Sequence, residues 1–153
     1  HALIKITLFF CAGAVMVKTG RTQIEDLRGL SRVMPFTCAT YTVGAISLMG
    51  TPLLPGFVSK WLIGSAAIET GTAMGMVGVA AILISAVLTA IYLMGPALSM
   101  YFRPLEGMEK VESCDPGWRM KLPFAVLAAV IVLCGLFSDP IITLLANLSA
   151  GVM

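Results

Sequence analysis

Charged side chains are scarce in this sequence of 153 residues: Lys, Arg, Asp and Glu together make up 12%, whereas 58% of the residues are hydrophobic. Soluble domains carry about 25% charged residues, so this balance excludes an ordinary soluble globular protein. The formal net charge of +2 is too small for a surface that binds nucleic acid. The mean hydropathy of +0.95 instead predicts an all-α, polytopic membrane protein in contact with the lipid bilayer.

Motifs for metals and redox groups are also lacking. Cys11, Cys38 and Cys134 lie in apolar segments, Cys114 lies in a loop, and no two cysteines have CxxC spacing. We therefore expect inert thiols, with no disulfide and no bound metal. Because no ligand cluster is present in the sequence, we also expect no cofactor and no catalytic residue. If the chain serves an oxidoreductase, it would be a non-redox subunit of it.

Four apolar units predict about four membrane crossings within a single membrane domain, 1–153. The units cover about 1–17, 36–68, 73–101 and 122–137, and a further apolar segment covers 141–152. This last segment either continues the fourth crossing or lies along the membrane surface. Since His1 already lies in an apolar unit, we expect the chain to be the C-terminal part of a longer protein.

The second unit is too long for one straight crossing. A continuous helix over 36–68 would measure about 50 Å, whereas the hydrocarbon core of a bilayer is roughly 30 Å thick. The unit contains a cluster of helix-breaking residues: Gly50, Pro52, Pro55 and Gly56. We therefore expect one crossing with a broken helix near 50–56. Lys60 follows the break, and a charge at this depth costs about 2.5–3.5 kcal/mol, which favours a functional role.

Two loops carry most of the basic residues. They are 18–35, with Lys18, Arg21, Arg28 and Arg32, and 103–121, with Arg103, Lys110, Arg119 and Lys121. If units 36–68 and 73–101 each cross once, both loops fall on the same side of the membrane. The positive-inside rule makes that side cytoplasmic. We therefore expect a multi-pass protein of the cell (inner) membrane.

Three titratable side chains are expected near the middle of the membrane. Lys5 lies about 18 Å from the cytoplasmic end of its helix, and Lys60 lies about 12 Å from the opposite end of its own helix. His1 precedes Lys5 by one helical turn, so the two share a face. Burial disfavours the charged form of lysine, and histidine changes its charge near neutral pH. We therefore predict a proton relay made of Lys60, Lys5 and His1.

Polar residues of the third unit are candidates for lining a wet path toward these groups. They are Ser85, Thr89 and Tyr92. The alternative for Ser and Thr is a hydrogen bond back to the backbone of their own helix.

A series of short motifs runs in order through the N-terminal part of the chain. The motifs are His1–Lys5, Leu8–Phe10, Ala12–Ala14, Thr19–Gly20, Ile24–Leu30, Met34–Pro35, Gly44–Leu48 and Gly50–Lys60. Together they resemble the antiporter-like membrane subunits that are shared by respiratory complex I, membrane-bound hydrogenases and Mrp-type sodium/proton antiporters. The remainder of the chain is similar to that family in hydropathy.

The resemblance implies a fourteen-helix fold with two inverted five-helix repeats, each with a broken helix, of which this chain would be the last four helices. Lys60 then matches the lysine or glutamate on the second repeat's broken helix, and Lys5 and His1 match positions on the preceding helix. The glutamate–lysine pair of the first repeat has no counterpart here.

We therefore expect a proton-translocating subunit of a multi-subunit membrane complex of complex I or hydrogenase type, with other membrane subunits as partners. The alternative is a component of an Mrp-type sodium/proton antiporter, similar to its D-type membrane protein, that moves Na⁺. The spanning segments hold no central Asp or Glu, which favours protons over Na⁺. A third interpretation is a membrane fragment that only packs against neighbours, and the expected mid-membrane lysines argue against it.

Overall fold

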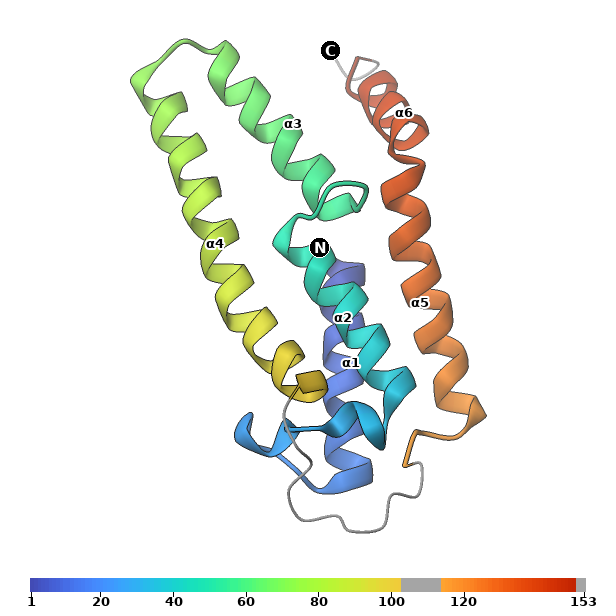
Figure 1. The fold of residues 1–153 in the computed structure, drawn as a ribbon. Helices are drawn as coiled ribbons and strands as arrows, with labels where there is room; N and C mark the ends of the chain where they lie inside the picture. The colour runs from blue at the N-terminus through green and yellow to red at the C-terminus, as the bar shows by residue number, and fades with distance from the viewer. Residues whose placement is uncertain (103–113, 151–153) are drawn as a thin grey trace.

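The computed structural model describes residues 1–102 and 114–150, and this part of the chain is helical without strands (Figure 1). The helices are α1 (Ala2–Thr19), α2 (Pro35–Met49), α3 (Pro55–Glu69), α4 (Ala73–Phe102), α5 (Trp118–Leu136) and α6 (Ser138–Ala150), with two short 3₁₀ turns at Glu25–Leu27 and Leu30–Arg32. Three helices, α1, α4 and α5, are each long and apolar enough to cross a membrane. The expected all-α, polytopic membrane fold is confirmed.

Helices α2 and α3 form the broken crossing. Each has 15 residues and is therefore about 22 Å long, which is too short to span roughly 30 Å of hydrocarbon. Figure 1 shows α3 rising from the upper end of α2, so that the pair runs alongside the single long helix α4. The two half-length helices therefore take the place of one crossing, as the length of the unit predicts.

The sequence explains where these helices begin and end. Pro35 and Pro55 occupy the first turns of α2 and α3, where a missing backbone N–H costs nothing. Gly20 and Gly50 follow α1 and α2 with φ of 68° and 98°, the left-handed conformation that ends many helices. The predicted boundaries therefore agree with the observed ones to within two residues at these four ends.

Helix α5 begins earlier than its apolar run predicts. The run predicts a start near residue 122, whereas the helix begins at Trp118 and includes Arg119 and Lys121 in its first turn. Arg119 is exposed and Lys121 is half-buried, so their charged ends reach the surface while the backbone is already helical. The C-terminal segment forms a separate helix, α6, which leaves the upper end of α5 after a bend at Phe137 (Figure 1).

The buried side chains form two clusters along the bundle. One lies at the end where α1 finishes and α2 begins, and it consists of Ala14, Val15, Leu30, Val33, Met34, Cys38, Met100 and Phe124. The other lies beside the break and consists of Ile4, Ala45, Leu48, Leu54, Leu93 and Ile131. The second cluster joins α1, α4 and α5 to α2 and, through Leu54, to the loop directly before α3.

Asp115 holds the start of α2 from a distant part of the chain. Its carboxylate accepts hydrogen bonds from the backbone N–H groups of Phe36 (3.2 Å) and Thr37 (3.4 Å), and from Thr37 Oγ1 (3.2 Å). The side chain of Asp115 is only 4% exposed and pairs with Lys121 at 3.6 Å. Because Met34, the residue before α2, makes no side-chain cap, Asp115 supplies the missing cap and places a negative charge at the positive end of the helix.

Replacing Asp115 with alanine is expected to lower the free energy of unfolding by about 1–2 kcal/mol, because the helix loses its cap and buried N–H groups lose their acceptor. Thermal unfolding in detergent is the measurement. Asp139→Ala is the matched control, since Asp139 also lies in the first turn of a helix but is exposed. Equal destabilisation by the two changes would contradict the capping role of Asp115.

Candidate functional site

The end of α2 leaves two backbone carbonyl groups without a partner from the helix itself. Gly50 N–H donates to Ser47 O (3.2 Å) and Thr51 N–H donates to Ile46 O (3.2 Å), the bonding pattern that commonly closes a helix at glycine. These bonds satisfy two of the last four carbonyls of α2. The carbonyls of Leu48 and Met49 remain, and they point into the break, where no further helical turn follows.

Lys60 satisfies both remaining carbonyls from the other half of the crossing. Its Nζ donates to Met49 O at 2.7 Å and to Leu48 O at 3.1 Å. The partial negative charge at the C-terminal end of a helix stabilises a cation, and hydrogen bonds from an ionised donor are stronger than neutral ones. The ammonium group on α3 therefore caps α2 across the break, and the cap is stronger when the amine is charged than when it is neutral.

Glycine at positions 50 and 56 allows this close approach. A Cβ on Gly50 would lie 3.2 Å from Lys60 Cδ and 3.3 Å from Nζ, and the positive φ of Gly50 is itself unfavourable for other residues. A Cβ on Gly56 would collide with the carbonyl oxygen of Ser47. The two half-helices therefore touch backbone to backbone, and Lys60 reaches over the contact.

Lys60 also lies at one end of an apolar groove of about 430 Å³ between α3 and α4. The groove is lined in addition by Met49, Gly50, Phe57, Trp61, Gly64, Ser65, Ile68, Val79, Ile82, Leu83 and Ala86. Among the described residues that line it, Lys60 is the one that carries a charge. A side chain that leaves the carbonyls has space to move into this groove.

The structure does not join the three predicted relay residues directly. His1 is exposed and Lys5 is half-buried on α1, whose N-terminal end lies at the height of the break (Figure 1). Within residues 1–102 and 114–150, no hydrogen bond links either of them to Lys60, whose partners are backbone carbonyls. A proton passing between them would need water to bridge the gap.

The predicted path residues of α4 lie elsewhere. Thr89 Oγ1 donates to Ser85 O at 2.7 Å, which is the bond back to the helix backbone that the alternative describes, and Ser85 itself is exposed. Neither residue lines the groove that holds Lys60, and Tyr92 does not line it either.

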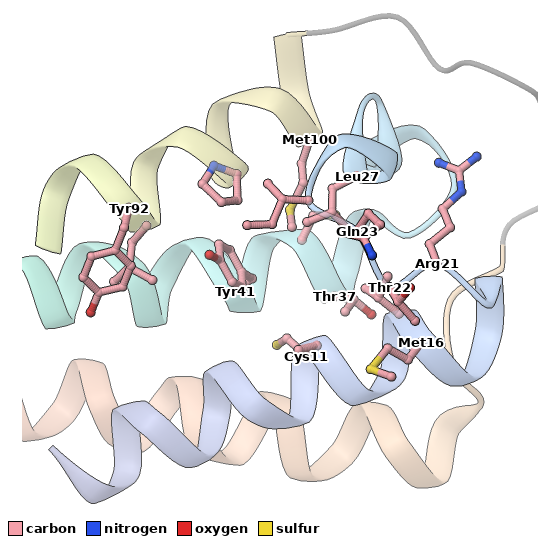
Figure 2. Close-up of a pocket in the computed structure, with 16 residues that line it drawn as sticks. Cys11, Met16, Arg21, Thr22, Gln23, Leu27, Thr37, Tyr41, Tyr92 and Met100 are labelled. Atoms are coloured by element: carbon pink, nitrogen blue, oxygen red, sulfur yellow. The ribbon is translucent and has the colours of Figure 1, made fainter.

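Tyr92 instead lines a second cavity, of about 330 Å³, enclosed by α1, α2, α4 and the segment after α1. Figure 2 shows Tyr92 on α4 and Tyr41 on α2 along the inner faces of their helices, with Cys11 of α1 opposite. The cavity therefore occupies the half of the bundle below the break, and it is separate from the groove that holds Lys60.

Ser47 is a polar residue at the break that sequence reasoning missed. It is fully buried, and within the described part of the chain its Oγ has no hydrogen-bond partner. Buried hydroxyl groups usually have a partner, which is often an ordered water. The only signal in the sequence is a small polar residue three positions before Gly50, and that signal does not distinguish it from an ordinary helix serine.

The part of the chain that contains the break matches a known protein family. The family described as "NADH:quinone oxidoreductase/Mrp antiporter, TM" matches residues 1–89, which include α1, the whole broken crossing and Lys60. Over 94% of its length the chain is 34% identical to NADH-quinone oxidoreductase subunit N of Desulforudis audaxviator, of which it covers 30%. It is likewise 34% identical to F(420)H(2) dehydrogenase subunit N of Methanosarcina mazei, again over 94% of the chain and 30% of that protein.

A solved structure has the same fold. A chain of respiratory complex I from Thermus thermophilus superposes with a TM-score of 0.67 and 24% identity, over 90% of this chain and 31% of that one. The present chain therefore spans about a third of the length of these similar proteins. By the family match to more than half of its residues, the chain belongs to the NADH:quinone oxidoreductase/Mrp antiporter membrane family.

Proposed function

We propose that this chain is the part of a proton-translocating, antiporter-like subunit that carries the proton site of a broken helix. Its parent would be a multi-subunit membrane complex of complex I or hydrogenase type. The observation that carries the proposal is the pair of hydrogen bonds from Lys60 Nζ to the last carbonyls of α2. The name of each similar subunit, NADH-quinone oxidoreductase or F(420)H(2) dehydrogenase, supports such a parent.

Lys60 would bind and release a proton by changing its contact with α2. The charged amine is stabilised by two carbonyl oxygens at the negative end of a helix. A neutral amine gains far less from these oxygens and is free to turn toward the apolar groove between α3 and α4. Protonation would therefore be coupled to the position of the side chain, which is what a relay between two sides of a membrane requires.

Lys5 and His1 are proposed as the neighbouring relay groups, reached through water near the break. Both side chains are at least partly accessible on α1 rather than sealed in the core. The unpartnered Oγ of Ser47 supplies a polar group at the same level of the bundle. We also propose that a separate stretch of the proton path runs along α4, outside the groove that holds Lys60. Its lining residues would be Ser85, Thr89 and Tyr92.

Sodium transport of the Mrp type is the second candidate, because the matching family includes Mrp antiporters. Backbone carbonyls at the end of a broken helix are ligands that Na⁺ also uses. In this chain the Lys60 ammonium occupies them, which favours protons. The test is the rate at which the parent complex acidifies the interior of proteoliposomes. We expect the same rate in sodium-free buffer, and a strict requirement for Na⁺ would contradict a pure proton role.

The same proposal places both basic segments on the cytoplasmic side. Gly29 N–H donates to Ser99 O and Cys114 N–H donates to Val33 O, so the segment after α1 lies at the same end of the bundle as the end of α4 and the start of α5. Residues 103–113 of the second loop lie outside the described part. The outer apolar side chains of α3 and α4, such as Ile63 and Ile84, would face lipid or neighbouring membrane subunits.

Cysteine labelling tests this orientation. In a variant without native cysteines, a membrane-impermeant maleimide added to right-side-out vesicles is expected to label Ala73→Cys, at the start of α4 directly after the turn that joins it to α3, and to spare Glu25→Cys. Both positions are exposed, so a difference in labelling reports the side of the membrane. Labelling of Glu25→Cys from outside would contradict the assignment.

A further inference from the structure

Helix α5 contacts the break at a glycine. Gly135 is buried against the backbone of the loop between α2 and α3. A Cβ on Gly135 would collide with the carbonyl oxygen of Leu53 and would lie 2.6 Å from Leu54 Cα and 3.0 Å from Leu53 C. These are backbone atoms, so they cannot rotate away as the end of a side chain could. Any side chain at position 135 must therefore push α5 and the loop apart.

The loop segment that meets Gly135 has an unfavourable conformation. Leu53 has φ of 72°, and it is the one residue other than glycine with positive φ among those described. Such a conformation persists only where the surroundings hold it. The Leu53 side chain is 70% exposed and contributes little, whereas Leu54 is 8% exposed and belongs to the same buried cluster as Ile131 of α5. The loop is therefore held by the backbone contact with Gly135, by the burial of Leu54 beside α5, and by the hydrogen bond from Leu54 N–H to Thr51 O.

The position of this loop sets the position of Lys60. Leu54 is the residue directly before α3, and Lys60 lies in the second turn of that helix. The Nζ distances of 2.7 Å and 3.1 Å to the carbonyls of α2 therefore depend on how far the loop separates the two half-helices. We propose that Gly135 is a positioning residue, which acts through Leu53 and Leu54 to keep Lys60 within reach of those carbonyls. This rests on the proposed proton role of Lys60.

Two features make the inference specific. The contact comes from α5, which lies beyond residues 1–89 where the family match ends. In addition, helix preference alone predicts that Gly135→Ala stabilises α5, since alanine is a better helix former than glycine inside a helix. A loss of function in this variant would therefore point to the contact with the loop. Gly95→Ala in α4 is a suitable control because a Cβ there meets nothing within 4 Å.

The test is proton pumping by the parent complex that carries Gly135→Ala, together with a cryo-EM structure of the variant. We expect pumping to fall by at least about tenfold, as small displacements of reacting groups commonly cost up to about a hundredfold. The pH profile of pumping should change, and Lys60 Nζ should lie beyond hydrogen-bond distance of Leu48 O and Met49 O. Gly95→Ala should change none of these. In a Lys60→Ala background, Gly135→Ala should cause no further loss.

The possible results separate the inference from the proposed function. Normal pumping by Gly135→Ala, retained contacts of Lys60, or a loss that adds to that of Lys60→Ala would overturn the positioning role. If Gly135→Ala displaces Lys60 but Lys60→Ala pumps normally, the positioning role stands and the proton role fails. If Gly135→Ala does not assemble, Ile131→Val removes one methyl group from the cluster beside the loop. It should then give a smaller change in the pH profile, and an unchanged profile would overturn the inference.

Discussion

Replacing Lys60 with alanine is expected to abolish most proton transport by the parent complex while leaving its assembly intact. Pumping should fall by at least about tenfold, because a positioned proton donor or acceptor contributes roughly 10²–10⁴-fold. Assembly should survive because two effects oppose each other. Removing a charge from the membrane interior relieves about 2.5–3.5 kcal/mol. Leaving the carbonyls of Leu48 and Met49 without a donor costs about 1–3 kcal/mol each.

Glutamate at position 60 should retain more activity than alanine. Burial favours the neutral form of a carboxylic acid, so a glutamate at this depth can also bind and release a proton. It cannot donate to two carbonyls at once, however, so activity should stay below that of the native residue. Pumping in proteoliposomes is the measurement, with Lys18→Ala as control, since Lys18 is exposed at the end of α1. Alanine and glutamate variants of equal activity would show that titration at position 60 is unimportant.

Replacing Gly56 with alanine is expected to have a large structural effect at the break. The new Cβ would collide with the carbonyl oxygen of Ser47 and lie 3.0 Å from its carbonyl carbon, within the buried end of α2. Because α2 backbone atoms cannot rotate aside, α3 must shift, and Lys60 shifts with it. Overpacking of this kind costs about 1–3 kcal/mol. We expect less assembled complex, and pumping near background in what does assemble.

The matched control for this variant is Gly78→Ala in α4, where a Cβ meets nothing within 4 Å. It should assemble and pump normally, and should be slightly stabilising because alanine favours helix. The comparison uses blue-native electrophoresis for assembly and the pumping rate per assembled complex. If Gly56→Ala behaves like Gly78→Ala on both measures, the close contact of the two half-helices is not needed for transport.

The architecture follows from the sequence where length and helix-breaking residues decide it. An apolar unit too long for one crossing, with Gly50 and Pro55 in its middle, leaves few alternatives to a broken helix. The contacts that define the site do not follow from the sequence. Asp115 caps α2 across 79 residues, and Gly135 meets the break from a helix that begins more than sixty positions after it. Such pairs depend on how the helices pack, and neither residue has a local pattern that reveals its partner.

Lys60 illustrates the same limit at the site itself. The sequence indicates its depth and its place beside the break, but it predicts other titratable groups as its partners. The structure instead pairs it with two backbone carbonyls, because a helix that ends inside the membrane leaves carbonyls that require a donor. The tyrosine expected along its path, Tyr92, lies nearer the C-terminal end of α4 than the residues of that helix that line the groove. It lines a different cavity (Figure 2).

The most direct test of the proton role of Lys60 is the number of protons pumped per electron transferred by the parent complex with Lys60→Arg. Arginine keeps a positive charge and hydrogen-bond donors for the carbonyls of Leu48 and Met49, so the cap across the break is preserved. It does not lose its proton in proteins, so it cannot release one. We predict a fully assembled complex with a clearly reduced proton-to-electron ratio. A ratio equal to that of the native complex would contradict the proton role, because Lys60 would then serve only to cap the helix.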